Sequence, residues 1–262
     1  MKIFFAGVED NRSAKMLSDI GIKYALFSGL NIIKKRYLSK KKDIPYKITQ
    51  RKLDVTILPF KETIMDSGLY SMMFGVYRGL LTSIKDAHLW YDSMIETIYE
   101  YNINSTIVEC DFQKLFPPEV AWQFRYRMRK DLPNHQIINV WHFEDGEKGF
   151  ERLLEFSDYL GIGVPEWRRH RPKSYKKYIV PLGQKIVAKG KKLHYLGCTE
   201  YTLLKDISFA TSCDSTSWLY YAWPKYFRKT HGVCLADKQI RMIINVRHYD
   251  EKTRLLGKIN ED

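Results

Sequence analysis

The sequence is poor in cysteine, and its four cysteines stand singly, without paired spacing. Zinc-binding cysteine sets and the disulfide frameworks of small secreted domains both need paired spacing, so neither is predicted. Three of the four fall at the ends of predicted strands, where a thiol acts as a small buried group. We therefore expect the reduced thiols of a cytoplasmic protein at Cys110, Cys198, Cys213 and Cys234.

Long hydrophobic runs are also absent. Residues 1–7 (Met-Lys-Ile-Phe-Phe-Ala-Gly) are apolar over too few positions for a signal peptide or a membrane span. We therefore expect a chain that stays out of membranes.

The glycine-rich phosphate fingerprint that open dinucleotide-binding sheets usually carry does not follow the first apolar run.

Acidic residues are in deficit, with 30 Asp and Glu against 43 Lys and Arg and a formal net charge of +13. This excess suits a polyanionic partner, nucleic acid before a membrane; a merely soluble basic surface is the alternative. Basic stretches at 34–42, 125–130 and 167–177 would contact the nucleic-acid backbone, and the last interleaves cations with aromatic rings. A solvated face or an exposed loop is the plainer interpretation. The predicted nucleic-acid-binding residues are Lys40, Lys41, Lys42, Arg168, Arg169, Arg171 and Lys173.

Apolar runs of strand length alternate with helical patterns, and no domain-sized linker separates them. The predicted strands cover residues 2–8, 24–28, 63–66, 105–111, 136–143, 159–164, 192–198 and 209–214. Alternation predicts a parallel sheet, and eight repeats favour closure into an α/β barrel of the (β/α)8 TIM type over an open doubly wound sheet. We expect a single domain over residues 1–262, with its barrel core at about 2–228 and a C-terminal extension at 229–262.

Helices are predicted between the strands. Asn11 or Ser13 would cap the first of them. The charge run at 34–42 is too dense for a core helix, so a solvated face is expected there. The predicted helices cover residues 11–20, 72–101 (as two helices), 117–130, 147–156, 178–188, 200–204 and 218–228.

Carboxylates stand at the ends of three predicted strands, as Asp66, Asp111 and Asp214. The carboxyl ends of barrel strands converge on one cavity, so side chains distant in sequence meet there. The alternative for Asp66 and Asp214 is a structural role, in a turn or as a helix cap. Glu109 and Asp111 lie two residues apart on a strand and would share one face.

Four segments resemble motifs of the tRNA-guanine transglycosylases, in the same order. Residues 66–70 (Asp-Ser-Gly-Leu-Tyr) resemble that family's Asp-Ser-Gly-Gly-Phe/Tyr-Gln motif, and residues 159–163 (Tyr-Leu-Gly-Ile-Gly) its Gly-Leu-Ala-Val-Gly strand. Residues 194–198 (His-Tyr-Leu-Gly-Cys) are similar to a strand ending in Leu-Met-Gly-Val-Gly. Residues 214–216 (Asp-Ser-Thr) stand where the family has its Asp-Cys-Val-Leu-Pro nucleophile segment. The resemblance covers roughly residues 60–220, and the Asp-Ser-Thr-Ser-Trp ending looks most like phage-type DNA transglycosylases.

The resemblance implies exchange of guanine in DNA for a free 7-deazaguanine base, such as the cyano or aminomethyl form, with no cofactor. Asp214 would be the nucleophile that forms a covalent sugar ester, and Asp66 the general acid/base. Two successive displacements would retain the configuration of the sugar. Because Asp66 must exchange a proton near neutrality, burial or mutual repulsion should raise its pKa. A viral origin would place the protein in the host cytoplasm.

The resemblance also implies a binding pocket for the base. Tyr70 matches the aromatic residue that stacks on the base, and Asp111 the carboxylate that reads the guanine edge. Ser67, Gly161 and Gly163 would line the pocket.

The sequence departs from the family in three respects. The cysteine and histidine set of the family's zinc subdomain is absent after Asp214, so no metal is predicted. The glutamine that contacts the base has no counterpart; Trp141 or His142 would replace it, unless both belong to the core. Glu109 and His194 are open between a structural and a chemical role.

Three alternatives to DNA base exchange remain. The substrate would be tRNA, or the barrel would bind nucleic acid without catalysis, or it would act on an unrelated phosphorylated small molecule. The sequence determines neither the inserted base nor the oligomeric state.

Overall fold

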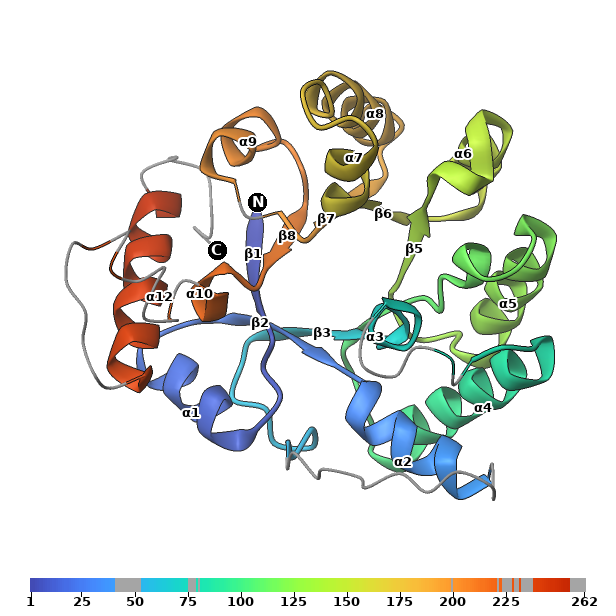
Figure 1. Ribbon diagram of the computed structural model, residues 1–262, viewed down its shortest axis with the longest axis horizontal. Helices are drawn as coiled ribbons and strands as arrows, with labels where there is room; N and C mark the ends of the chain where they lie inside the picture. Colours follow the sequence, from blue (N-terminus) through green and yellow to red (C-terminus); the bar gives the residue numbers. More distant parts are fainter. Residues whose placement is uncertain are drawn as a thin grey trace.

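The computed structural model describes residues 1–40, 53–74, 81–198, 200–220 and 238–254, with Gly79, Ala222, Arg228 and His231. Eight parallel strands close into one barrel in chain order, because β1 pairs with both β2 and β8 (Figure 1). The predicted (β/α)8 TIM barrel is therefore confirmed. The strands are β1 (Lys2–Ala6), β2 (Tyr24–Ser28), β3 (Glu62–Asp66), β4 (Thr106–Val108), β5 (Ile137–Trp141), β6 (Tyr159–Gly163), β7 (Lys192–Leu196) and β8 (Ser212–Ser215).

Helices form an outer ring around the strands (Figure 1). The α-helices of the described residues are α1 (Asn11–Asp19), α2 (Leu30–Lys40), α3 (Leu69–Phe74), α4 (Ile84–Glu100), α5 (Pro118–Asp131), α6 (Gly146–Phe156), α7 (Val164–His170), α8 (Lys176–Ala188), α9 (Tyr201–Asp206), α10 (Ser217–Tyr220) and α12 (Lys238–Arg254). Two 3-10 turns, η1 (Phe112–Lys114) and η2 (Phe143–Asp145), follow β4 and β5. None of the helices described is both long enough and apolar enough to cross a membrane.

Two hydrophobic cores flank the barrel wall, because alternate residues of a strand face opposite sides. The inner core fills the barrel with side chains such as Phe4, Leu26 and Ile138. The larger outer core lies between the strands and the helices and includes Trp90, Trp122 and other aromatic residues. The interior is therefore packed, and chemistry is confined to its rims.

Helix α2 was not predicted, because its residues read as a solvated charge run. Within it, Tyr37 is 0% and Lys34 2% exposed. The helix packs on α4 and pairs its outer cations with that helix, Lys40 Nζ lying 2.7 Å from Glu96 Oε1. Opposite charges on the neighbouring helix therefore allow a basic helix to pack against the core. Lys41 and Lys42 lie outside the described residues.

Helix α1 begins where predicted, but its cap is different. Asp10 Oδ1 accepts a 2.7 Å hydrogen bond from the Ser13 amide, so Asp10 caps the helix instead of Asn11 or Ser13. A side-chain acceptor one residue earlier serves the same unpaired amides.

The segment predicted as a C-terminal extension contributes α12, which packs against α10. Arg241 Nε donates to the Ala222 carbonyl at 2.6 Å, and Asn245 Nδ2 to the Trp218 carbonyl at 3.3 Å. Trp218 in turn donates its indole N–H to the Ala6 carbonyl of β1 at 2.8 Å. Helix α12 thus takes the place of an outer barrel helix, beside α1 in Figure 1.

Candidate active site

Asp66 is the last residue of β3, at the carboxyl rim of the barrel. The turn after it needs a glycine, because Gly68 has φ +75° and a Cβ there would lie 2.7 Å from Leu30 Cα. This turn directs the amides of Ser67 and Gly68 onto the Asp66 carboxylate. The sequence Asp-Ser-Gly therefore builds a fixed position for one carboxylate.

The ionisation of Asp66 is strongly shifted. Burial, followed by the charges of Asp111 and Asp214, raises the pKa of Asp66 to about 7, although the two amide hydrogen bonds oppose the shift. The prediction of a raised pKa is confirmed. It also follows that the three aspartates share one region, because charges interact this way only over short distances.

Asp214 lies in β8 and is 7% exposed. Its Oδ1 accepts two hydrogen bonds, one from His194 Nε2 at 3.1 Å and one from the Gly197 amide at 2.9 Å. Gly197 follows β7 with φ +66°, which turns its amide toward β8. Asp214 is therefore a buried acceptor held by two donors, and the helix-cap alternative does not describe it.

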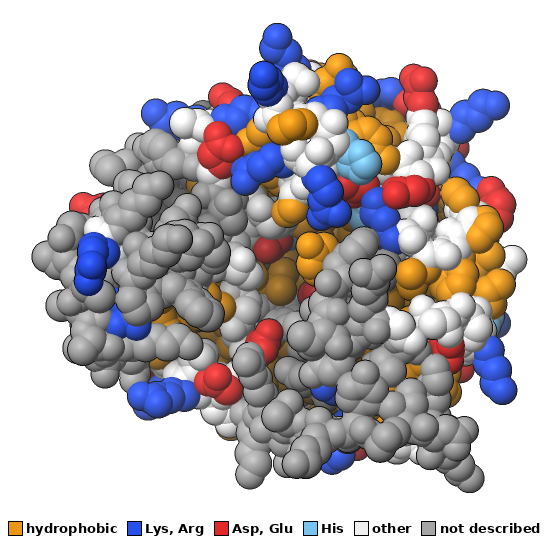
Figure 2. All heavy atoms as spheres, in the orientation of Figure 1, with side chains coloured by type: hydrophobic (Ala, Val, Ile, Leu, Met, Phe, Trp, Pro, Cys, Tyr) orange, Lys and Arg blue, Asp and Glu red, His pale blue; other side chains and the backbone are white. Residues whose placement is uncertain are grey.

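The three carboxylates meet at one end of the barrel, because the strands that carry them run parallel. Figure 2 shows the molecule in the orientation of Figure 1, with a hollow at the centre. Hydrophobic side chains form its floor and acidic side chains lie around it (Figure 2). This is the arrangement expected of a barrel active site.

Asp111 is held by His142, which follows β5. His142 Nε2 lies 3.0 Å from Asp111 Oδ2, and its Nδ1 lies 2.7 Å from Glu166 Oε2. Burial disfavours the charged imidazole, but the contacts with Asp111 and Glu166 raise the pKa of His142 to about 9. Burial would raise the pKa of Glu166, but its contacts with His142 and Lys114 lower that pKa to about 2. His142 is therefore a fixed cation beside Asp111 at neutral pH.

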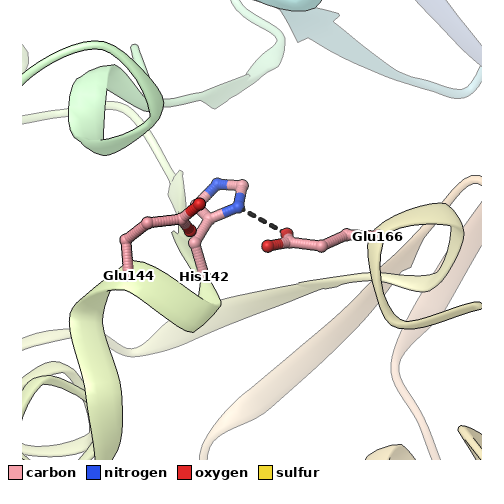
Figure 3. A group of neighbouring side chains, drawn as sticks. All are labelled: His142, Glu144 and Glu166. Carbon is pink, nitrogen blue, oxygen red and sulfur yellow. Dashed lines mark hydrogen bonds and ion pairs between the residues drawn. The ribbon is translucent and has the colours of Figure 1, made fainter. Parts of the chain in front are cut away.

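His142, Glu144 and Glu166 offer ligand atoms within 4.8 Å of one another, and in the described residues they are a group that could hold a metal ion. Figure 3 shows the carboxylates of η2 and α7 reaching toward the imidazole. However, Lys114 Nζ contacts both carboxylates, at 2.6 Å from Glu144 Oε2 and closely at Glu166. A metal would require the imidazole to lose its proton and the ammonium to leave. The geometry thus favours an ionic network that positions Asp111.

We expect a nuclear magnetic resonance titration of the imidazole C–H signals to give His142 a pKa near 9. Substituting Glu166→Gln should lower that pKa by about one unit or more, because one of the two negative partners is removed. Glu151→Gln removes an exposed carboxylate that pairs with Lys185 elsewhere, and should leave the value unchanged. An unaltered His142 signal in the Glu166 variant would contradict the network.

Glu109 and Asp111 do not share a face, contrary to expectation. The strand ends at Val108, so the backbone turns before Asp111. Glu109 is 1% exposed, points outward, and pairs with the buried Arg125 at 2.9 Å. Arg125 is thus structural, and the prediction that it contacts nucleic acid is wrong.

The predicted base-pocket residues lie in different places. Trp141 packs against Phe150 and Trp167 in the outer core, so the prediction that it contacts the base is wrong. Gly161 faces the interior, where a Cβ would lie 2.9 Å from Leu196 Cδ1, so side chains and not a ligand occupy its space.

The remaining predicted pocket residues reach the rim. Gly163 ends β6, and a Cβ there would lie 3.7 Å from Glu166 Oε2. Ser67 is buried within the Asp66 turn. Tyr70, the second residue of α3 and four residues after Asp66, is 56% exposed.

The basic residues divide between the two ends of the barrel. Each outer helix that follows a strand begins at the carboxyl rim and runs away from it. Lys40 therefore ends α2 at the far end, already paired with Glu96. Residues 125–130 likewise lie on the second half of α5, so these two stretches do not join 167–177 in one surface next to the aspartates.

The segment 167–177 follows β6 at the rim and is helical as far as His170. Arg169, Arg171 and Lys173 are exposed, whereas Arg168 pairs with Glu200 at 3.1 Å. Trp167 is 4% exposed and belongs to the core. The predicted nucleic-acid-binding residues near the candidate site are therefore reduced to three well-exposed cations.

Lys114 and Glu166 were missed by reasoning from the sequence. They come from η1 and α7, and nothing in their local pattern marks them as partners. The only signal is position, because each follows a barrel strand by a few residues and so starts at the rim.

The described cysteines, Cys110, Cys198 and Cys213, are free and buried, as expected. Cys234 lies outside the described residues.

Comparisons with known proteins add little to this description. No family model matches the chain, and no curated protein matches it. Among solved structures, 2,3-dimethylmalate lyase, a member of the PEP mutase/isocitrate lyase superfamily, is similar at a TM-score of 0.38 and 12% identity. The match covers 97% of this chain and 92% of that one. That neighbour belongs to an enzyme superfamily, but a likeness at this level bears on neither activity nor site residues.

Proposed function

We propose that this protein is a guanine transglycosylase that exchanges guanine in DNA for a 7-deazaguanine base. The observation that carries the proposal is the pairing of two unlike carboxylates at one rim. The pKa of Asp66 is raised to about 7 by burial and by its carboxylate neighbours. Asp214 is held by two hydrogen-bond donors. A proton carrier and an anchored carboxylate at one rim, close enough for their charges to interact, suit a double displacement at a sugar carbon.

In the first step the Asp214 carboxylate attacks C1′ of the target nucleotide. The C1′–N9 bond breaks, a sugar ester forms, and the departing guanine takes a proton from Asp66. In the second step Asp66 removes the N9 proton of the incoming base, which attacks C1′ and displaces Asp214. Both carboxylates return to their starting states, and the sugar keeps its configuration.

Several features support a base as the exchanged group. The Asp111 carboxylate beside protonated His142 is a fixed acceptor for adjacent N–H donors, such as those on the guanine edge. Tyr70 follows Asp66 by four residues and is 56% exposed, and stacking of a base on such a ring contributes about 1–3 kcal/mol. A base in a duplex is unreachable, so the target must be flipped out or single-stranded. The proposal includes a cytoplasmic location, that of the host if the source is viral.

The direct test is incubation of the protein with DNA or tRNA and isotopically labelled 7-deazaguanines, followed by nucleoside mass spectrometry. We expect label in DNA nucleosides and release of free guanine in equal amounts. Label in tRNA alone would replace DNA with tRNA as the substrate. No incorporation into either, with nucleic acid still bound, would identify a non-catalytic binding barrel instead.

Exposed cations at the rim should make DNA binding depend on salt. The double substitution Arg171→Ala and Lys173→Ala should weaken binding about tenfold and reduce the slope of log K against log [salt] by roughly 2. Lys189→Ala is the control, because it removes one cation that is exposed at the far end of α8. Equal weakening per removed charge in a fluorescence anisotropy titration would show that overall charge, and not this surface, binds DNA.

A further inference from the structure

We propose that His194 is a positioning residue that fixes one oxygen of Asp214 and leaves the other as the attacking atom. This inference rests on the proposed function, since it names which oxygen of the nucleophile attacks. It comes from a line of buried polar side chains inside the barrel. From the rim inward these are Asp214, His194, Ser212 and Tyr159.

The two oxygens of Asp214 have different surroundings. Oδ1 accepts from His194 Nε2 and from the Gly197 amide. Oδ2 makes no hydrogen bond to any residue that the structure describes, and the Asp214 side chain keeps 10% of its surface exposed. A carboxylate oxygen that already accepts two hydrogen bonds is the poorer nucleophile, so the other oxygen is the one that attacks C1′.

The hydrogen bonds also determine the tautomer of His194. A carboxylate only accepts, so the Nε2 of His194 must carry the proton that faces Asp214. The other ring nitrogen, Nδ1, hydrogen-bonds to Ser212 Oγ. In a neutral imidazole this nitrogen accepts, and the Ser212 hydroxyl must then donate to it.

Tyr159 completes the line at the far end. Its hydroxyl hydrogen-bonds to Ser212 Oγ, which accepts if its own proton points to His194. Burial, offset in part by Ser212 and reinforced by the charge of Glu62, raises the pKa of Tyr159 to about 12, so this phenol keeps its proton. Every donor in the line therefore points toward Asp214.

Strand register places these groups in contact. His194 of β7 pairs with Ser212 of β8, and Ser212 and Asp214 lie two residues apart on the same face. The rings of Phe4 and Tyr159 lie 6.3 Å and 6.4 Å from the His194 ring, and His194 is 0% exposed. Water therefore cannot replace the imidazole as the donor to Asp214 without a rearrangement of the barrel interior.

The activity test uses substitutions that keep volume but remove donors. His194→Phe should lower kcat about 100-fold or more with KM within about threefold, since the substrate contacts are untouched. His194→Gln, which keeps an amide donor, should recover at least about tenfold of that loss. Tyr159→Phe, at the end of the line farthest from Asp214, should lower kcat less than about fivefold. Equal kcat in the wild type and His194→Phe would overturn the inference, as would no rescue by Gln.

A spectroscopic measurement keeps the inference testable if a variant does not fold. In wild-type protein labelled with ¹⁵N-histidine, His194 should show a protonated Nε2 and an unprotonated Nδ1. The opposite tautomer would overturn the inference. The two hypotheses are contradicted by different results. If the wild type shows no base exchange, the proposed function is wrong whatever the tautomer of His194. If the wild type exchanges bases and the His194 variants do so equally well, only the positioning role is wrong.

Discussion

Substituting Asp214→Asn will abolish base exchange and leave DNA affinity within about threefold of the wild type. Removing a covalent nucleophile costs on the order of 10⁴-fold or more in rate. The fold should survive, because the asparagine carbonyl can still accept from His194 and from the Gly197 amide. What changes is the other atom, where an amide nitrogen replaces the oxygen that would bond to C1′.

The measurement has two parts, exchange by mass spectrometry and trapping of a protein–DNA ester on a denaturing gel. Wild type should give the ester in the absence of an incoming base, and Asp214→Asn should not. Asp206→Asn is the matched control, because Asp206 is an exposed aspartate of α9. Full exchange activity in the Asp214 variant would show that another group is the nucleophile.

The barrel could be predicted from the sequence because its signals are local. Each strand is a short apolar run, and the alternation with helices needs no knowledge of long-range contacts. The position of Asp66 was predictable for the same reason. Asp-Ser-Gly marks a turn, and a turn after a barrel strand lies at the rim.

The rest depended on partners that are distant in sequence. Glu109 was ambiguous until Arg125, on the next helix, was seen to neutralise it. Trp141 and His142 are neighbours in the chain, yet the first packs outside the wall and the second binds Asp111 at the rim. Which of the two side chains faces the outer core and which lies at the rim depends on where β5 ends. The ends of strands are the least predictable feature of a sequence. Helix α2 was missed because its charges are balanced by α4, which begins more than forty residues later.

Substituting Asp66→Asn should reduce exchange by about 10²–10⁴-fold and yet make the protein more stable at pH 8. The pKa of Asp66 rises from 3.8 to about 7 on folding, so the folded protein binds this proton more tightly than the unfolded chain. The stability of the wild type should therefore fall as pH rises from about 4 to 7, and stay low above that. A shift of this size corresponds to at most about 4 kcal/mol. Partial exposure to solvent and the loss of two charged hydrogen bonds reduce the expected gain to about 1–3 kcal/mol.

Urea unfolding of both proteins across pH 4–8 measures this difference. The gain of Asp66→Asn should be smallest at pH 4, where the folded carboxyl is protonated and the unfolded one has only begun to ionise, and should reach its full size at pH 8. Asp206→Asn again provides the control and should show no such trend, because that side chain is exposed. A residue whose removal stabilises the fold but destroys activity is held for chemistry and not for structure. If Asp66→Asn is instead less stable than the wild type at pH 8, Asp66 is a turn residue whose carboxylate stabilises the backbone.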